Sequence, residues 1–129
     1  GLPVNEIFAL YLKRALDYIF KNPEAIGFLM HNIPQYERFR HVAGFSYMAR
    51  FHAEMLETVK AFMPPDSPEE MVRVWLYVII TMGYTFAGSS DYLSNLMGVA
   101  PESDFYRRRV YETIIFVFMP SFFVFTNQT

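Results

Sequence analysis

The sequence predicts an all-α fold in a single domain, and three observations support that prediction. Apolar residues recur at three- and four-residue steps through most of the chain, which is the spacing of one face of a helix. Proline, asparagine and glycine stand between these segments, where they end or begin helices. No stretch alternates apolar and polar residues between hairpin turns, as strands would require. We therefore expect a bundle of five to six helices over residues 1–129.

The first half of the chain is divided by two prolines. A helix is expected over residues 4–21, and it ends because Asn22 precedes a proline, a position that disfavours the α conformation. Asn22 can cap a second helix over residues 23–31, in which proline takes the first position. After the next proline, a long helix is expected over residues 35–63. Gly44 inside this helix costs about 1 kcal/mol relative to alanine, which predicts a close helix crossing there.

The second half opens with the clearest local signal in the chain. In Ser67-Pro68-Glu69-Glu70, the serine and the second glutamate have the spacing of a capping box, with proline at the first helical position. The helix that follows is expected to reach about residue 86, and residues 74–80 are apolar on every side. Such a helix must be covered by its own core on one side and by something else on the other.

Two further segments complete the expected bundle. A short helix over residues 91–97 is followed by a last helix from residue 103 or 104 to residue 119, where Pro120 interrupts it. In this helix Arg107-Arg108-Arg109 points in three directions about 100° apart. The run therefore predicts a solvated edge or a salt-bridged rim rather than one patch for phosphate or nucleic acid.

Composition and spacing exclude several kinds of chemistry. Without cysteine, the 129 residues can form no disulfide, thiolate nucleophile or cysteine-based zinc site. The net charge of −2 argues against a free-standing nucleic-acid binder, and 53% hydrophobic residues exclude intrinsic disorder. His41 and His52 would lie about 16 Å apart along a helix, so one metal ion cannot bridge them. With no catalytic triad or phosphate-binding glycine loop either, we expect no enzymatic activity, metal or cofactor.

The hydropathy of the chain raises the question of a membrane span. Residues 74–90 form its longest uncharged central stretch, 17 residues, which is the lower limit for crossing the hydrocarbon core. Polar residues and glycines dilute the second half of this stretch, and no basic cluster flanks it. We therefore expect a soluble, cytoplasmic chain without a membrane partner, and a membrane-embedded helical protein is the less favoured alternative.

The aromatic and methionine content predicts an apolar cavity. Fourteen Phe, nine Tyr and eight Met exceed what a small core needs, and such side chains suit adaptable ligand cavities. Arg50, Glu54 and Asn95 are further polar groups that could orient a ligand. The candidate ligand-binding residues are Phe28, Phe39, Tyr47, Met48, Phe51, His52, Met55, Trp75 and Tyr84, although each taken singly also suits a core.

The order of the segments resembles a known family. Asn22-Pro23-Glu24, the long helix to Met63, Ser67–Met71, Thr81–Gly88 and Met97-Gly98 before the last helix together resemble the C-terminal domain of tetracycline-repressor (TetR) family regulators. The resemblance covers nearly the whole chain, but it is one of architecture more than of signature residues. It implies an effector-sensing domain that binds a small hydrophobic or amphipathic ligand. In such regulators an N-terminal helix-turn-helix domain reads DNA, and we expect that domain to be absent from this chain.

The resemblance also implies a homodimer, formed by the last two long helices of each subunit in a four-helix bundle. Independently, a symmetric partner is the commonest cover for an apolar helix of a small soluble domain. A protein-interaction module without ligand sensing is the alternative from another functional class. The expected dimer interface comprises Val74, Tyr77, Val78, Thr81, Tyr111, Ile114, Ile115 and Phe118.

Overall fold

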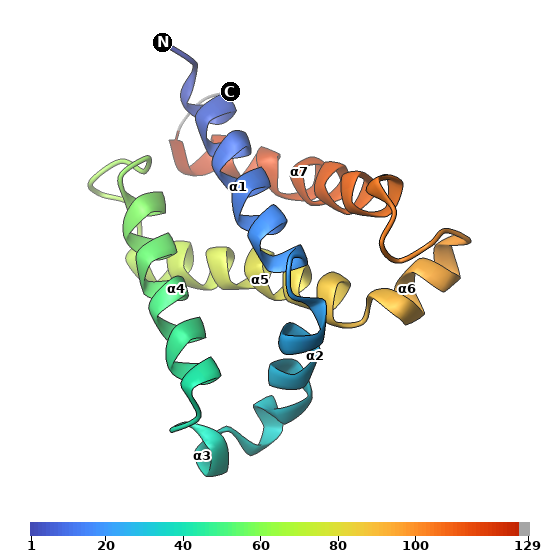
Figure 1. The fold of residues 1–129 in the computed structure, drawn as a ribbon. Coiled ribbons are helices and arrows are strands. Elements are labelled where there is room, and N and C mark those ends of the chain that lie inside the picture. Colours follow the sequence, from blue (N-terminus) through green and yellow to red (C-terminus); the bar gives the residue numbers. More distant parts are fainter. Residues whose placement is uncertain (127–129) are drawn as a thin grey trace.

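The computed structural model describes residues 1–126, and this part of the chain is helical with no strand. Six longer helices are joined by turns and short loops, with a short helical corner between the second and third of them (Figure 1). The all-α prediction is therefore confirmed. The longer helices are α1 (Val4–Phe20), α2 (Pro23–Asn32), α4 (Ala43–Lys60), α5 (Glu69–Gly88), α6 (Ser90–Met97) and α7 (Asp104–Thr126), and the corner comprises η1 (Ile33–Gln35) and α3 (Tyr36–Phe39).

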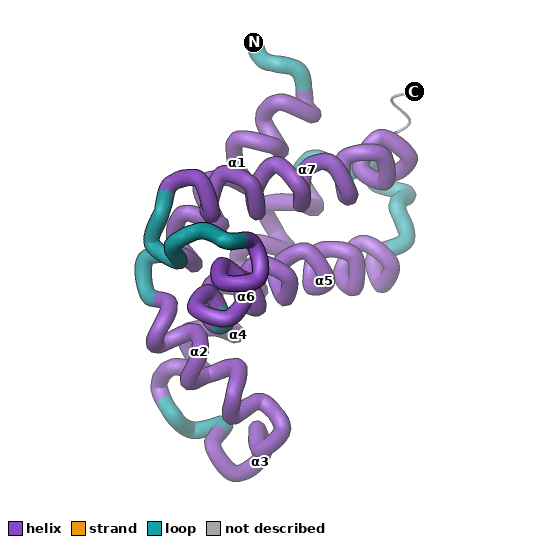
Figure 2. Tube along the Cα trace, turned by 90° about the vertical axis from the view of Figure 1, so that its right-hand side faces the viewer, coloured by secondary structure: helices purple, strands orange, loops and turns teal. Residues whose placement is uncertain are grey.

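Helix α5 is the centre of the fold, and α1, α2, α4, α6 and α7 all contact it. Helix α7 runs antiparallel beside it, while α1 lies across both (Figures 1 and 2). Two hydrogen bonds fix the antiparallel pair near its two ends. Trp75 Nε1 donates to Ser121 Oγ at 2.7 Å, and Tyr106 Oη donates to the Phe86 carbonyl at 2.6 Å.

Three aromatic rings fill the space where α1, α5 and α7 meet. Phe8 and Phe122 stack with their ring centroids 4.5 Å apart and their planes within 10°. Trp75 lies against both, at 5.6 Å from Phe8 and 6.5 Å from Phe122. We call Phe8, Trp75 and Phe122 the aromatic stack, and the first and last of these rings are almost fully buried.

Helices α2 and α5 cross at a pair of glycines. A Cβ atom added to Gly88 would lie 3.0 Å from the Cα atom of Gly27, and one added to Gly27 would lie 3.0 Å from the Gly88 carbonyl oxygen. Both neighbours are backbone atoms, which cannot rotate away. The small residues therefore allow this crossing to be as close as it is.

The prediction of one long helix over residues 35–63 is wrong, because the helical conformation is interrupted at residues 40–42. Val42 adopts an extended conformation with φ −65° and ψ 133°, and α4 begins after it. The break lets the Tyr36 ring pack edge-on against Phe45, with centroids 5.6 Å apart. In one continuous helix these residues would lie about 13 Å apart along the axis. The apolar periodicity continues across the break, so it gave no sign of the turn.

The predicted capping box does not form either. Helix α5 begins at Glu69 without a side-chain cap. Ser67 lies in the preceding turn, where its backbone N–H donates to the Pro64 carbonyl. The carboxylate of Glu70 is held by Arg73 at 3.3 Å, so it does not reach back to the turn.

Helix α7 continues past Pro120, where the sequence predicted its end. Proline removes one backbone donor, but Pro120 lies on the exposed side, where water can satisfy the freed carbonyl. Beyond it, Phe122 is held in the aromatic stack and Ser121 Oγ donates to the Phe118 carbonyl at 2.7 Å. The burial of Phe122 therefore outweighs the local preference of proline.

Candidate functional site

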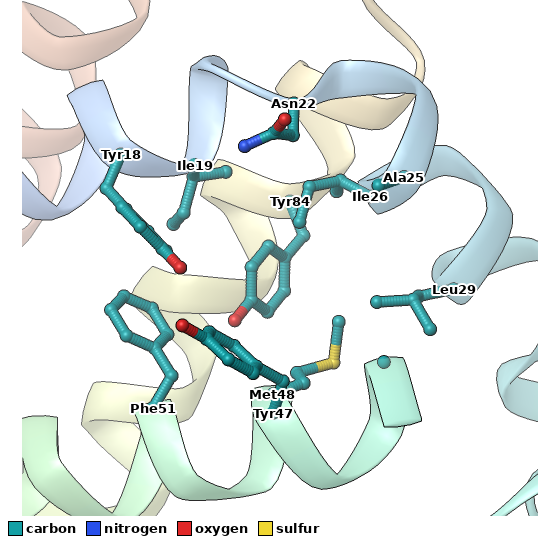
Figure 3. Close-up of a pocket in the computed structure, with 11 residues that line it drawn as sticks. Tyr18, Ile19, Asn22, Ala25, Ile26, Leu29, Tyr47, Met48, Phe51 and Tyr84 are labelled. Atoms are coloured by element: carbon teal, nitrogen blue, oxygen red, sulfur yellow. The ribbon is translucent and has the colours of Figure 1, made fainter. Parts of the chain in front are cut away.

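A cavity of about 210 Å³ lies where α1, α2, α4 and α5 approach one another. It is lined mainly by apolar side chains, and none of its lining residues carries a formal charge (Figure 3). The turn after α1 brings the end of that helix next to the start of α2, and α4 and α5 provide the other walls. The lining residues are Tyr18, Ile19, Asn22, Ala25, Ile26, Leu29, Gly44, Tyr47, Met48, Phe51 and Tyr84.

Small residues shape one wall of the cavity. Gly44 faces Leu29 across the α2–α4 contact, and a Cβ atom added there would lie 3.0 Å from Leu29 Cδ2. The close crossing predicted at Gly44 is therefore confirmed. The next turns of α4 then present Tyr47, Met48 and Phe51 to the cavity.

Hydroxyl groups converge at this apolar cavity, which is partly open to solvent. The hydroxyls of Tyr18, Tyr47 and Tyr84, which come from three different helices, point toward one another (Figure 3). A hydrogen bond of 2.9 Å joins Tyr84 Oη to His52 Nε2. The imidazole packs between two tyrosine rings, with centroids 5.5 Å from those of both Tyr77 and Tyr84. The cavity thus combines apolar walls with a few convergent polar atoms, which is typical of small-molecule sites.

Burial changes the acid–base properties of the two paired residues. Desolvation lowers the pKa of His52, since the buried imidazole disfavours its charged form. Desolvation, with a smaller contribution from the nearby Tyr18, raises the pKa of Tyr84 well above its usual range. At neutral pH the pair is therefore uncharged, and it is a hydrogen-bonding group rather than an ionic one.

Some of the candidate ligand-binding residues do meet at this cavity. Tyr47, Met48, Phe51 and Tyr84 line it, and His52 lies directly behind Tyr84. The structure therefore brings these five side chains together, whereas ligand binding by them stays a prediction.

The other four candidates lie elsewhere. Met55 is 2% exposed in the core, and Trp75 belongs to the aromatic stack. Phe28 is 58% exposed on α2, and Phe39 lies at the α3 corner with Arg38 over its ring. The structure does not bring these four residues to the cavity, since residue type alone does not distinguish a core ring from a cavity ring. Of the polar groups expected nearby, Glu54 and Asn95 do not line the cavity, and Arg50 is exposed with its guanidinium over the Tyr47 ring.

Most of the wall formed by α1 and α2 was missed. Tyr18, Asn22, Ile26 and Leu29 line the cavity but were not among the candidate ligand-binding residues. Asn22 makes no side-chain capping bond to α2, contrary to the sequence prediction, and lines the cavity instead. The turn at Asn22-Pro23 was the available signal, because two helices joined by so short a turn must lie close together there.

A second feature is an exposed apolar surface on α5 and α7. Figure 2 shows these helices along one edge of the molecule, with no other described helix beyond them. Phe116 is 81% exposed, Val124 72% and Val74 58%, values unusual for large apolar side chains. We call this surface the outer apolar face, and it comprises Met71, Val74, Val78, Phe116, Val117 and Val124.

The predicted interface residues match this surface on α5 better than on α7. Val74, Val78 and Thr81 are exposed. In contrast, Tyr77 packs on His52 of α4.

On α7 the predicted interface residues do not lie on the exposed side. Ile114 is 1% exposed and buried among the other helices of the chain. Tyr111 Oη donates to the Ala9 carbonyl of α1, and Ile115 and Phe118 pack partly against the core. Since α7 is apolar almost all round after its first three turns, periodicity could not tell its inner side from its outer side.

Charged residues elsewhere could form two further kinds of site. Among residues 1–126, no group of three His, Asp or Glu side chains could hold a metal ion. Arg107 lies over the Phe20 ring, while Arg108 and Arg109 pair with Glu112 at 3.9 Å and 3.2 Å. The arginine run thus forms a salt-bridged edge, as its spacing predicted.

Two helices are long and apolar enough to cross a membrane, judged by length and composition alone. They are α5 and α7, and the most apolar windows of these helices are 39% and 17% buried within the fold. The core helix of a soluble protein can meet the same criteria, so this finding is weak support for a membrane location.

No family model, curated protein or solved structure matches this chain. The resemblance to TetR regulators therefore stays a prediction from the sequence.

Proposed function

We propose that this chain is the effector-sensing and dimerisation domain of a TetR-like transcriptional regulator. The observation that carries the proposal is the apolar cavity with converging hydroxyls at the meeting point of α1, α2, α4 and α5. A small hydrophobic or amphipathic molecule is the ligand that such walls favour. DNA would be bound only through an N-terminal domain outside this chain.

Ligand binding acts on the fold through α1 and α4. Tyr18 at the end of α1 and Tyr47 on α4 both line the cavity and are partly solvent-exposed, so a ligand between them changes the spacing of the two helices. Helix α1 leads from the cavity back to the first residues of the chain, and a continuous helix can transmit such a change as one rigid element. The ligand shifts the equilibrium only by its difference in affinity for the two arrangements.

A second copy of the chain covers the outer apolar face in this proposal. The face lies on two antiparallel helices, and a twofold axis would pair it with itself to form a four-helix contact. Large apolar side chains gather there, whereas the charged residues of α7 lie mainly in its first three turns. The cytoplasmic, soluble location that we expected from the sequence belongs to the same proposal.

Native mass spectrometry of the purified chain tests both parts of the proposal. The expected species is a dimer of 15.2-kDa chains, in which a fraction carries a small-molecule adduct. The double variant Val78→Glu/Phe116→Glu should be monomeric, because it would place like charges in an apolar contact. The matched control Ala49→Glu, on the exposed side of α4, should stay dimeric. A wild-type chain that is monomeric at all concentrations would contradict the dimer.

A membrane-embedded helical protein is the second candidate, and the low burial of α7 favours it. In that case lipid rather than a second copy would cover Phe116, Val117 and Val124. The two candidates differ in their need for detergent. A chain that is purified and stays monodisperse in detergent-free buffer supports the soluble dimer, while aggregation that only detergent reverses supports the membrane protein.

A further inference from the structure

We propose that the cavity accepts an uncharged molecule with one ring or two fused rings, which carries a hydroxyl or carbonyl group. This inference rests on the ligand-sensing role proposed above and names the chemical class of the ligand. It depends on three properties of the cavity: its volume, the absence of charge in its lining, and the two-way hydrogen bonding of the His52–Tyr84 pair.

The volume of the cavity suits a small ring system. A dry cavity of about 150 Å³ holds one benzene molecule, and drug-sized ligands need about 300 Å³ or more. At about 210 Å³ the present cavity lies between these cases. The flat rings of Tyr47, Phe51 and Tyr84 among its walls favour a planar guest, because offset stacking with it adds to the burial of apolar surface.

The absence of charged lining residues favours an uncharged ligand. A charged group that enters an apolar cavity loses part of its hydration, and an opposite charge is the strongest compensation for that loss. None of the residues that line the cavity supplies one. His52 does not supply a positive charge either, since burial lowers the pKa of its imidazole and keeps it neutral at pH 7.

The hydrogen-bonding groups favour a hydroxyl or carbonyl on the ligand. In one tautomer His52 Nε2 accepts the Tyr84 hydroxyl proton, which leaves the phenolic oxygen free to accept from a ligand. In the other tautomer Nε2–H donates to Tyr84, whose own proton is then free for a ligand acceptor. Tyr18 and Tyr47 add two hydroxyls that point the same way. A ligand hydroxyl, which both donates and accepts, suits either state.

Arg50 is the charged group that could favour an anion instead. Its guanidinium lies 5.7 Å from the centroid of the Tyr47 ring, and its side chain is exposed to solvent. A carboxylate at the mouth of the cavity could pair with it only where water screens the attraction. The uncharged class is therefore favoured, and an anion selected by Arg50 is the alternative that the experiment must separate.

Three probes of one shape test the inference on the purified full chain. They are 2-naphthol, which is uncharged at pH 7, the apolar naphthalene and the anionic 2-naphthoate, with affinities measured by isothermal titration calorimetry. We expect 2-naphthol to bind about fivefold more tightly than naphthalene, the gain typical of a net hydrogen bond. It should bind at least about tenfold more tightly than 2-naphthoate, whose charge is not compensated.

Variants locate the binding and identify the polar partner. Tyr84→Phe should remove the preference for 2-naphthol over naphthalene and leave naphthalene binding within about twofold of the wild type. Ala25→Trp places a large ring on the cavity wall and should abolish binding of both probes, while Ala53→Trp on the exposed side of α4 should not. Far-ultraviolet circular dichroism of each variant checks that the helices are retained.

The outcomes separate this inference from the function on which it rests. If 2-naphthoate binds most tightly, and Arg50→Gln removes its advantage, the uncharged class is wrong but the cavity still binds ligands. If Tyr84→Phe keeps the full preference for 2-naphthol, the assignment of the polar partner is wrong. If no probe binds, or if Ala25→Trp leaves binding unchanged, both the ligand class and the sensing role are contradicted.

Discussion

The two ends of α1 lead into two aromatic regions of different character. Near its start, Phe8 joins the aromatic stack, whose rings lie nearly parallel with centroids 4.5 Å to 6.5 Å apart. Near its end, Tyr18 lines a cavity of about 210 Å³ among tyrosine, phenylalanine and methionine side chains. One region is filled and the other is hollow, although both are built from large apolar residues.

The difference follows from where the polar atoms lie. The one polar atom on the rings of the stack is Trp75 Nε1–H, and it donates outward to Ser121 Oγ, so the ring faces can close together. At the cavity the hydroxyls of three tyrosines point toward one another: Tyr84 Oη is bonded to His52 Nε2, while Tyr18 and Tyr47 are partly exposed to solvent. Aromatic content alone therefore does not create a cavity, and the two regions differ in whether polar atoms gather between the rings.

Truncation of one ring in each region should reveal this difference most strongly. Phe122→Ala removes a fully buried ring and should lower the free energy of unfolding by about 3–5 kcal/mol. Phe51→Ala removes a partly buried ring beside existing empty space and should cost about 1–2 kcal/mol. Urea unfolding of both variants at one protein concentration measures the two losses. Equal losses would mean that the cavity region is packed as tightly as the stack.

A smaller effect on stability is expected when a methyl group is added at either of two helix crossings. Gly88→Ala directs its Cβ at the backbone of Gly27, which cannot give way, and should destabilise the fold by about 1–3 kcal/mol. Gly44→Ala meets only the end of the Leu29 side chain, which can rotate into the cavity. Its helix propensity gains about 1 kcal/mol, so the net change in stability should be close to zero.

The same pair of variants also separates stability from binding. Gly44→Ala should weaken binding of 2-naphthol, because Leu29 takes up part of the cavity. Thermal unfolding with and without this probe measures both properties in one experiment. If Gly44→Ala destabilises the chain as much as Gly88→Ala, the cavity wall is rigid and the contrast between the two regions is weaker than proposed.

Helices marked by proline or glycine could be predicted closely from the sequence. Helices α1, α2 and α6 begin and end within one residue of the expected bounds, because Pro23 and Gly98 act locally on the backbone. The break before α4 and the continuation of α7 through Pro120 could not be predicted. Both depend on distant packing, of Tyr36 on Phe45 and of Phe122 in the stack.

The candidate site was predictable only in part, for a similar reason. The periodicity of α4 places Tyr47 and Phe51 on one face, and this much follows from the sequence. Which helices face that side depends on the closeness of the α2–α5 crossing at Gly27 and Gly88, which no local pattern encodes. The outer side of α7 was missed because a helix that is apolar all round offers no contrast between its faces.

The smallest expected effect is a pH dependence of the free energy of unfolding that arises from His52 in the cavity region. Burial lowers the pKa of His52 in the folded chain below the value of about 6.5 that it has when unfolded. Between these two pKa values the unfolded chain binds more protons than the folded one, so acid favours unfolding. The stability associated with neutral, buried His52 is fully present above about pH 6.5. It is lost as the pH falls through that value toward the lower pKa of the folded chain.

Urea midpoints measured from about pH 8 to about pH 5 test this dependence. Replacement of the imidazole by His52→Phe should flatten the profile below about pH 6.5, because no proton is then taken up at this position. His41→Phe, at an exposed position before α4, should leave the profile unchanged. Added 2-naphthol should steepen the wild-type profile, since the ligand further desolvates a pair that must stay neutral to bind it. If both histidine variants give the same profile as the wild type, the His52–Tyr84 pair does not distinguish the hollow region from the filled one.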